Sequence, residues 1–449
     1  MGITKKYSYY VMAFAGLGGF LYGFDVGVIS GALVFIEKDL GLNESQISLI
    51  VAAVLGGGAA ATLITGPLAD IIGRKVMIII SGILFILGIY LTVIADSYSE
   101  IMLGRLIQGL GVGIITIVLP LYLAETTPAY LRGRGVTLFQ LFLTAGILIA
   151  ALSDTLFHKS GNWRAMFGIA LIPGTIFFIG SLFLIKSPRW LFKKGFKDKA
   201  LNVLLRITDD EEARRSYNEL IELEDREKDF SFNIKNLREK FYILPFILAL
   251  SVGILNQAVG INSILQFSTY IIKQTGVPSV YVAMMGTVSI TLMNFIITII
   301  AFLLIDKIGR RPLLTIGTFG CMLSLFFVGL VLLLAKPSNL QGYLTIFGLI
   351  VYISFFAIGP GVVVWLAVSE ILPLKIRSIS MSIALFANSL TSAILAAIFL
   401  DLTKFIGYAG PFFLCGFFAL LYFLITFLYL PESKGMTLEE VEVYWKDRC

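Results

Sequence analysis

One acidic residue lies deep inside an apolar stretch near the start of the chain. Asp25 is the only charged residue between Tyr7 and Ile36. A charged side chain at the centre of a bilayer costs roughly 2.5 to 3.5 kcal/mol on insertion scales, so such a residue faces a cavity or a partner. Arg105 is the obvious partner, because it is the one cation within a later apolar stretch.

An Asp–Arg pair in this setting can capture and release a proton. Apolar surroundings favour the neutral acid, whereas a nearby guanidinium favours the carboxylate. Movement of Arg105 relative to Asp25 would therefore switch the acid between proton capture and proton release, which couples a proton to a conformational cycle. The alternative is a static buried ion pair that only holds two helices together.

Amide side chains in other apolar stretches could recognise a neutral, hydroxylated substrate. An amide offers a carbonyl acceptor and an NH₂ donor at once, which suits hydroxyl groups. Gln257 and Asn262 are five residues apart with Gly260 between them, so a local break in the helix would let both face one cavity. A single membrane amide more often joins helices. The candidates are therefore taken as a group: Gln140, Asn256, Gln257, Asn262, Asn294 and Asn388.

The elements that carry these residues are membrane helices. The 449-residue chain is 57% hydrophobic and 14% charged, whereas a soluble domain has about 25% charged residues. A hydrocarbon core about 30 Å thick needs about 20 apolar helical residues, and the alternation typical of barrel strands is absent. We predict an all-α membrane protein with twelve transmembrane helices, at 8–31, 48–69, 76–95, 100–123, 134–155, 164–185, 241–272, 281–305, 312–335, 342–368, 379–403 and 410–429.

The distribution of positive charge predicts the orientation of the chain. With both termini inside, 28 of the 35 Lys and Arg residues fall in cytoplasmic segments and six fall outside. Cytoplasmic loops carry this excess in multi-pass membrane proteins. We therefore predict a protein of the inner (plasma) membrane with both termini in the cytoplasm, and the excess of positive charge does not indicate nucleic-acid binding.

Three short charged patterns occur twice along the chain, at offsets of 236, 245 and 246 residues. Internal repeats of this kind are common in transporters, and three independent markers agree here on two six-helix bundles. The predicted parts are an N-terminal bundle (1–185), a cytoplasmic linker (186–240) with short amphipathic helices at 199–207 and 233–241, a C-terminal bundle (241–430) and a short cytoplasmic tail (431–449).

These charged patterns lie at the inner ends of helices, where acids can pair with arginines of neighbouring helices. Such pairs could join the two bundles while the inner side is closed and separate when it opens. The alternative is that the charges only set the topology. The residues predicted to form these salt bridges are Asp70, Arg74, Glu125, Arg132, Arg189, Asp306, Arg310, Glu370, Arg377 and Glu432.

Six motifs along the whole chain resemble those of the sugar porter family of the major facilitator superfamily: "GRLIQGLGVG", "YLAETTPAYLRG", "SPRW", "NQAVGIN", "DKIGRRP" and "PESKG". The resemblance implies a substrate cavity at the membrane midplane and alternating access by rocking of the two bundles. It also implies proton coupling, because proton-coupled members have an Asp at the position of Asp25 where facilitative relatives tend to have a neutral residue. The residues that it implies for sugar binding are Gln140, Gln257, Asn262, Asn294 and Asn388, with Trp365 stacking on the sugar ring. Phe24, directly before Asp25, is a further candidate for substrate binding.

Some positions depart from the pattern of the family, so the resemblance does not carry a glucose specificity to this chain. The departures are Asn256 for a glutamine, Gln266-Phe267 for an aromatic pair, Ala151 for a second glutamine, Ser389 for a bulky residue and Lys186 for an acid. Gly359, Pro360 and Gly361 follow the family and predict a break in the helix just before Trp365.

Together these observations predict a proton-coupled symporter that imports a monosaccharide, a hexose or a pentose, and is not an enzyme. Its expected partners are the sugar, a proton and the lipid bilayer, with no nucleic acid, metal or cofactor, and a single chain is expected to suffice. The alternatives are a facilitative uniporter of a sugar or of a polyol such as inositol, a sensor that binds sugar without transporting it, and an exporter of apolar compounds. The amide group argues against the exporter.

Overall fold

The structure is a computed structural model that describes residues 3–229, 240–436, 440–441 and 444–445. Helices make up the fold, and no strand occurs in these ranges. Twelve helical segments are long and apolar enough to cross a membrane, which confirms the predicted number of spans. The first span was predicted to end at residue 31, but the helix α1 continues beyond this point to Leu40.

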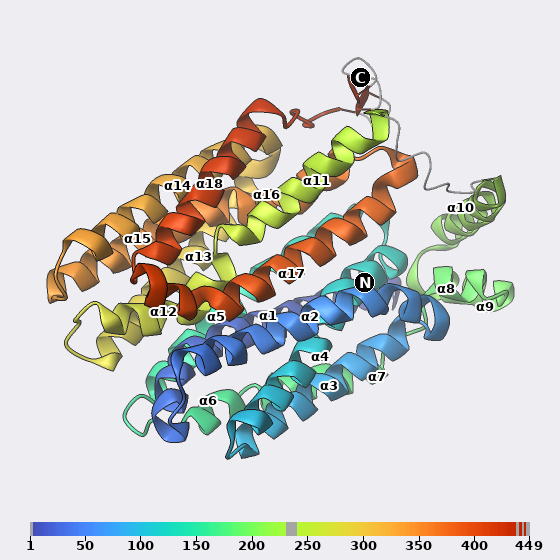
Figure 1. Cartoon of the computed structure of the whole chain (residues 1–449). Coiled ribbons are helices and arrows are strands. Elements are labelled where there is room, and N and C mark those ends of the chain that lie inside the picture. The colour runs from blue at the N-terminus through green and yellow to red at the C-terminus, as the bar shows by residue number, and fades with distance from the viewer. Residues whose placement is uncertain (1–2, 230–239, 437–439, 442–443, 446–449) are drawn as a thin grey trace.

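The two halves of the chain contain the membrane helices, and the linker contributes three further helices (Figure 1). The first half holds α1 (Ile3–Leu40), α2 (Glu44–Ile72), α3 (Arg74–Ile94), α4 (Tyr98–Thr126), α5 (Ala129–Leu156), α6 (Trp163–Gly168) and α7 (Leu171–Leu182). The linker holds α8 (Pro188–Lys193), α9 (Lys197–Ile207) and α10 (Asp210–Asp229). The second half holds α11 (Lys240–Ala258), α12 (Ile261–Gln274), α13 (Val280–Ile308), α14 (Arg310–Leu334), α15 (Asn339–Ile358), α16 (Pro360–Ile371), α17 (Leu374–Ile406) and α18 (Gly410–Leu428).

Three of the twelve spans are divided into two helices. The seventh is divided at Gly260, whose φ of +86° is a left-handed conformation that glycine adopts most readily. A side chain at this position would also clash, because a Cβ atom would lie 2.7 Å from the Sγ atom of Cys415. The tenth span is divided at Gly359, just before Pro360, and the sixth consists of α6 and α7. The predicted breaks beside Gln257 and Trp365 are therefore present.

Glycines bring α1 and α5 into close contact. A Cβ atom on Gly19 would lie 2.1 Å from the carbonyl oxygen of Phe139, and one on Gly23 would lie 1.8 Å from that of Leu143. Small residues permit this backbone approach, which is the usual basis of tight helix packing in membranes. The packing matters for the site because α1 carries Asp25.

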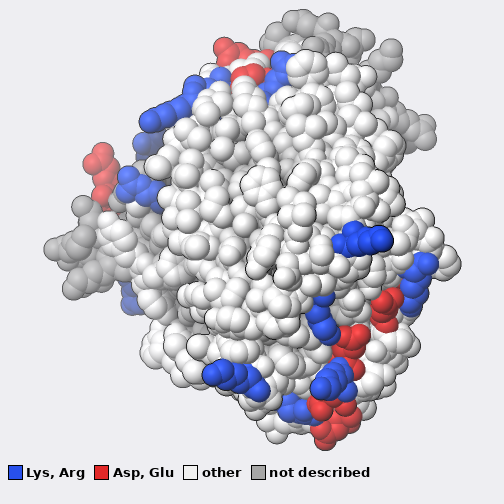
Figure 2. All heavy atoms as spheres, turned by 90° about the vertical axis from the view of Figure 1, so that its left-hand side faces the viewer, with Lys and Arg blue, Asp and Glu red and all other residues white. Residues whose placement is uncertain are grey.

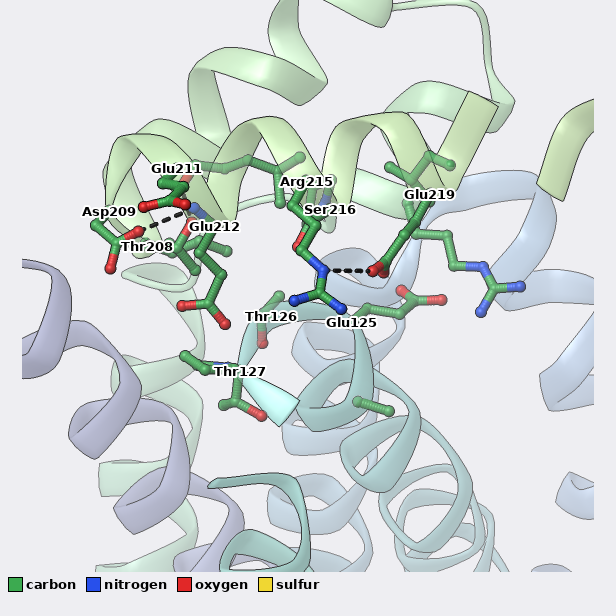
Figure 3. Close-up of a pocket in the computed structure, with 17 residues that line it drawn as sticks. Glu125, Thr126, Thr127, Thr208, Asp209, Glu211, Glu212, Arg215, Ser216 and Glu219 are labelled. Atoms are coloured by element: carbon green, nitrogen blue, oxygen red, sulfur yellow. Dashed lines mark hydrogen bonds and ion pairs between the residues drawn. The ribbon is translucent and has the colours of Figure 1, made fainter. Parts of the chain in front are cut away.

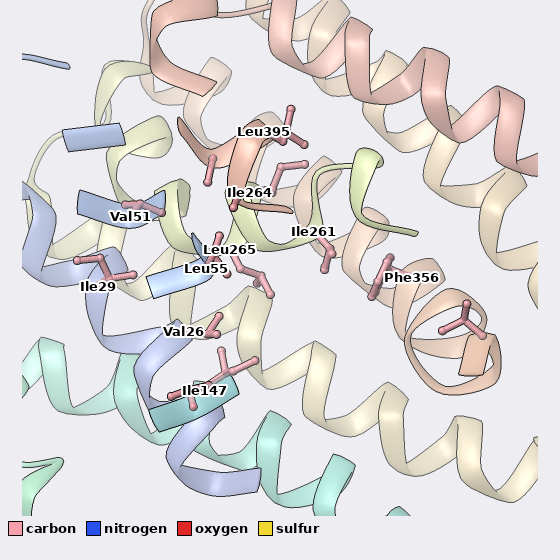
Figure 4. Close-up of a cluster of buried hydrophobic side chains, with 14 of the residues drawn as sticks. Val26, Ile29, Val51, Leu55, Ile147, Ile261, Ile264, Leu265, Phe356 and Leu395 are labelled. Atoms are coloured by element: carbon pink, nitrogen blue, oxygen red, sulfur yellow. The ribbon is translucent and has the colours of Figure 1, made fainter. Parts of the chain in front are cut away.

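The two halves meet along three helix pairs, α2 with α17, α5 with α13 and α1 with α12. Buried hydrophobic side chains from both halves pack together near the centre of the molecule, among them Val26 and Ile29 of α1, Leu265 of α12 and Leu395 of α17 (Figure 4). Uncharged residues cover most of the face seen in Figure 2.

The linker forms helices beside the end of the bundle where α1 begins (Figure 1). The predicted amphipathic helix at 199–207 lies within α9. Helix α10 was not predicted from the sequence. Of the second predicted helix, at 233–241, residues 233–239 lie outside the described ranges. The Tyr7 hydroxyl lies 2.6 Å from that of Tyr122 and accepts a hydrogen bond from the backbone N–H of Ile185, which fastens the start of the linker to α1 and α4.

Candidate functional site

Asp25 and Arg105 form a direct ion pair inside the first half. The Arg105 Nη1 atom donates a 2.6 Å hydrogen bond to Oδ1 of Asp25. The Arg105 and Asp25 side chains are 0% and 1% exposed, so water does not screen their interaction. The pair that the sequence suggested is therefore present, and it joins α4 to α1.

Gln108 extends this ion pair and was not among the residues predicted from the sequence. Its Oε1 atom accepts a 3.1 Å hydrogen bond from the same Arg105 nitrogen, and its side chain is fully buried. The spacing of three residues from Arg105 could have identified it, because residues at this spacing share one helix face. The Phe167 ring lies 5.3 Å from the Arg105 guanidinium carbon and provides an aromatic contact.

The guanidinium group of Arg105 is incompletely satisfied. Its Nε and Nη2 atoms are buried and have no hydrogen-bond partner, and neither does the Nε2 atom of Gln108. A buried charge that lacks partners is strongly destabilising unless a counter-charge stays close. The arrangement therefore depends on Asp25 remaining ionised, and neutralisation of Asp25 would weaken the hold of α1 on α4.

Polar side chains of the second half converge around the break at Gly260. The Nδ2 atom of Asn262 donates to Oε1 of Gln257 at 3.1 Å and to Oγ of Ser392 at 2.8 Å. Gln257 lies near the end of α11, Asn262 at the start of α12 and Ser392 on α17. The predicted pair of amides thus meets across the helix break. Ser392, which bonds to Asn262, was not predicted from the sequence.

Several buried amide side chains have polar atoms without a hydrogen-bond partner in the protein. The Oδ1 atoms of Asn256 and Asn388 and the Nε2 atom of Gln266 are buried and lack a hydrogen bond. Buried polar groups are normally satisfied, so an unsatisfied set in one region marks a place where a polar ligand or water could bind. Gln266 follows Asn262 by four residues and therefore lies on the same face of α12.

The remaining predicted sugar-binding residues lie on helices around this region. Gln140 is half-buried on α5, Asn294 is buried on α13 and Trp365 is half-buried on α16. Phe24 is buried on α1, directly before Asp25. Its ring centroid lies 6.0 Å from that of Phe20.

A buried network at the inner end of the first half joins Arg74 to Glu125. The Arg74 Nε atom lies 2.9 Å from Oε2 of Glu125, and its Nη1 atom lies 2.8 Å from Oδ1 of Asp70. Ser187 also donates a hydrogen bond to Glu125, which brings the start of α8 into the network. This network connects α2, α3 and α4 to the linker.

The second half repeats this arrangement. Arg310 donates through Nε and Nη2 to the two carboxylate oxygens of Glu370, at 3.1 and 3.2 Å. Ser433 donates to Glu370 at 2.6 Å, as Ser187 does to Glu125. Glu432 adds an acceptor for the backbone N–H of Arg310. The repeat seen in the sequence is thus a repeat of side-chain geometry.

The remaining residues predicted to form salt bridges are Arg377, Arg189, Arg132 and Asp306. Arg377 donates from Nε and Nη2 to the carbonyl oxygen of Leu372. Arg189 is exposed, and no ion pair joins it to another residue in the described ranges. The side chains of Arg132 and Asp306 lie outside what the structure describes.

The inner ion pairs of the described residues do not join the two bundles, which is the arrangement expected of an open inner side, so pairing between the bundles stays a prediction for the closed inner side. Among the described residues, each inner-side pair connects two residues of the same half or of the linker and the first half. The hydrogen bonds that join the halves within the described part of the chain lie near the other ends of the helices. Ser30 of α1 bonds to Ser268 and Thr269 of α12, and Lys404 of α17 donates to Ser45 of α2. The structure is therefore closed at the end of the bundles that the sequence predicts to be the outer side.

A cavity of about 600 Å³ lies on the inner side between the linker and the first half (Figure 3). Glu125 and Thr127 line it at the junction of α4 and α5, and residues of α8, α9 and α10 line it from the linker. Arg215 and Glu219, which line it from α10, form an ion pair of 3.4 Å. The cavity lies beside the Arg74–Glu125 network and apart from the buried amides.

The chain matches known sugar transporters over nearly its whole length. A family profile described as "Sugar (and other) transporter" matches residues 11–445. The galactose-proton symporter of Escherichia coli K12 is 32% identical over 441 residues, which cover 98% of this chain and 94% of the relative. The arabinose-proton symporter of the same organism is 33% identical, with 98% and 93% covered, and a putative metabolite transport protein of Bacillus subtilis is 34% identical, with 99% and 97% covered.

Solved structures give the same result. The inward open conformation of the xylose transporter XylE from E. coli superposes with a TM-score of 0.83 at 25% identity, covering 98% of this chain and all of that chain. The proton:xylose symporter XylE bound to 6-bromo-6-deoxy-D-glucose superposes with a TM-score of 0.80 at 26% identity, covering 98% and 100%.

Proposed function

Because the chain belongs to the sugar porter family of the major facilitator superfamily, and so is a membrane sugar transporter rather than an enzyme, we propose that it is a proton-coupled symporter of a monosaccharide. The observation that carries the proposal is the isolated, fully buried pair of Asp25 and Arg105, with 2.6 Å between charged atoms. Relatives of comparable identity are named as proton symporters of galactose and arabinose, which supports the same coupling here.

The proposed cycle begins with the outer side open. A proton from outside neutralises Asp25 and weakens its hold on Arg105, whose charge remains partly satisfied by Gln108. The halves then close over sugar bound mainly by the second half. Opening of the inner side lets Asp25 lose its proton to the cytoplasm as the sugar leaves, and the ion pair seen in this outer-closed structure forms again.

The sugar would bind to the amides around the Gly260 break. We assign hydroxyl contacts to Gln140, Asn256, Gln257, Asn262, Asn294 and Asn388, and ring contacts to Trp365 and Phe24. The unsatisfied atoms of Asn256 and Asn388 support this assignment, because a sugar hydroxyl would supply the missing donors. The substrate class is hexose or pentose, since relatives named for galactose, arabinose, xylose and glucose match the chain about equally well.

The topology that we propose places both termini and the linker in the cytoplasm. It rests on the excess of Lys and Arg in the segments on that side. The parts proposed from the sequence, two six-helix bundles with a linker between them, agree with the helix order, and a single chain would suffice for transport.

The decisive experiment measures sugar accumulation in vesicles with and without an imposed proton gradient. The unmodified protein should accumulate sugar only with the gradient, and Asp25→Asn should equilibrate sugar without accumulating it while retaining exchange of labelled for unlabelled sugar. Asp96→Asn, a change at an exposed acid of the outer surface, is the matched control and should accumulate normally. Accumulation by Asp25→Asn would contradict the proposal.

A second measurement separates the symporter from a uniporter. Addition of sugar to lightly buffered cells should make the external medium more alkaline if a proton enters with each sugar. No change of external pH during rapid uptake would identify a uniporter with a static ion pair. A thermal-shift panel of hexoses, pentoses and inositols would then identify the substrate.

A further inference from the structure

A second buried acid, Asp154, lies near the outer end of α5 and is not needed for the proposed cycle. Its side chain is 2% exposed. Its Oδ2 atom accepts a 3.1 Å hydrogen bond from the backbone N–H of Gly31 on α1, and its Oδ1 atom is buried without a partner. No cation pairs with it among the described residues.

The chemistry of this environment favours the neutral acid. An ionised carboxylate has two oxygens that seek several donors or a cation, and here one N–H is the only donor. Burying an unpaired charge is far less favourable than burying the protonated group. The burial of Asp154 with a single donor therefore favours its carboxylic acid form in this structure.

Among the described residues, no cation forms an ion pair with Asp154, and the nearby charged groups have other partners. On α1, Asp25 is paired with Arg105 of α4, and Glu37 accepts a hydrogen bond from the Tyr270 hydroxyl. On α6, Arg164 is paired with the acids Asp39 and Asp96. On α13, Tyr281 packs against His158, which lies in the turn after α5 and whose Nδ1 atom lies 2.7 Å from the carbonyl oxygen of Thr155.

Asp154 is directly connected to the contact that closes the outer side. Gly31, its hydrogen-bond partner, follows Ser30, and a Cβ atom on Gly31 would lie 2.4 Å from the Asp154 carboxylate. The Ser30 hydroxyl lies 2.9 Å from that of Ser268 and 3.0 Å from that of Thr269. Both of these α12 hydroxyls also lie within 3 Å of the Thr287 hydroxyl on α13. Asp154 thus bonds to the turn of α1 that contains Ser30 and Gly31, and this turn contacts the opposite half.

We propose that Asp154 is a gating proton site: it binds a proton when the outer side closes and returns it to the outer medium when the outer side opens. Withdrawal of α12 and α13 from α1 and α5 would admit water to the junction and allow the acid to ionise. The bound proton is never delivered to the cytoplasm, so this site changes the pH at which the outer side closes and leaves the number of protons carried with each sugar unchanged. The proposal does not depend on Asp25 carrying the coupled proton.

The test compares the unmodified protein with Asp154→Asn, in which the amide keeps an oxygen for the Gly31 N–H and cannot ionise. Spin labels at the exposed outer positions Lys159 and Lys336, one in each half, would report opening of the outer side by their distance. Each label requires a Lys→Cys change, with Cys449→Ser to avoid labelling at the terminus, since Cys321 and Cys415 are buried.

In the unmodified protein, raising the pH should increase the population with a long distance between the labels. Under the proposed cycle, Asp25 accounts for part of this increase, so Asp154→Asn should keep a smaller increase, while its sugar accumulation and protons per sugar should remain those of the unmodified protein. Glu37→Gln is the matched control, because it neutralises an acid at the same end of α1, and it should keep the pH response.

Three results would overturn the proposal. The pH response could be absent from the unmodified protein or equal in Asp154→Asn, which would make Asp154 a static packing residue. It could disappear in Glu37→Gln alone, which would assign the proton to Glu37. Accumulation could fail in Asp154→Asn, which would make the proton a transported one. Infrared difference spectra provide an independent check, because the carboxylic acid C=O band of the outer-closed protein should be missing in Asp154→Asn even if opening is impaired.

Discussion

Glu432 accepts a 3.0 Å hydrogen bond from the backbone N–H of Arg310, the first residue of α14. Its other carboxylate oxygen accepts from the N–H of Arg311 at 3.1 Å. The first N–H groups of a helix have no partner within the helix, and an acid at this end also interacts favourably with the helix dipole. The repeat places Lys186 at the corresponding position of the first half, where it cannot accept these bonds.

Replacement of Lys186 by glutamate should supply the missing acceptor at the start of α3. We expect Lys186→Glu to be more stable than Lys186→Gln by about 0.5 to 1 kcal/mol, the usual size of a helix-dipole interaction. Both variants lose the contact between the Lys186 ammonium and the Trp190 ring, so their difference isolates the carboxylate. Thermal unfolding in detergent measures it, and equal melting temperatures would show that the introduced carboxylate does not reach the N–H groups of α3.

The two repeated Arg–Glu pairs should contribute unequally to stability. Glu125 is 2% exposed and Glu370 is 26% exposed in their pairs with Arg74 and Arg310. Removing one partner of a buried pair costs about 3 kcal/mol or more, whereas a more solvated pair contributes about 1 kcal/mol. Glu125→Gln should therefore lower the free energy of unfolding more than Glu370→Gln does, as measured by denaturant unfolding of the purified protein. A larger loss in Glu370→Gln would contradict this ranking.

Ser392 should position Asn262 for the substrate without being required for folding. Ser392→Ala removes the 2.8 Å bond to Asn262, and a hydrogen bond of about 1 kcal/mol corresponds to roughly a fivefold rise in KM. Ser392→Thr, which keeps the hydroxyl, should restore most of the affinity. Ser354→Ala is the matched control, because that hydroxyl bonds only to a carbonyl of its own helix. An unchanged KM in Ser392→Ala, measured by initial rates of uptake, would remove Ser392 from the site.

Loss of the Ser30 hydroxyl should favour opening of the outer side. Ser30→Ala removes two side-chain bonds to α12, at 2.9 and 3.0 Å, and about 1 kcal/mol for each would shift the equilibrium by roughly tenfold or more. The increase in distance between labels at Lys159 and Lys336 measures this shift. Ser289→Ala, at an exposed hydroxyl bonded within its own helix, should leave the distances unchanged. No shift in Ser30→Ala would mean that apolar contacts alone close the outer side.

The twelve spans, the pairing of Asp25 with Arg105 and the repeat could all be predicted, because each depends on residue type and spacing along the chain. The hydrocarbon thickness sets the length of a span. An isolated acid and an isolated cation in hydrocarbon have few other partners. The helix breaks at Gly260 and Gly359 were also predictable, since glycine and proline weaken helices locally.

Other parts of the site could not be predicted in this way. Asp154 and Ser392 are single polar residues within apolar spans, and spacing alone does not say which neighbouring helix they face. Pairing between the bundles on a closed inner side stays a prediction, because in this structure Glu125 and Glu370 each pair with an arginine of their own half.

By itself, the sequence determined that this chain crosses the membrane twelve times, that its halves repeat and that one acid and one arginine meet in hydrocarbon, since burial in lipid limits where charge can lie. Only the tertiary structure decided that Asn262 bonds to Ser392, 130 residues away, that Asp154 supports the turn at Gly31, and that the outer side is closed. The physical reason is that one sequence can pack its two halves in more than one way, and contacts between distant helices depend on which packing is present.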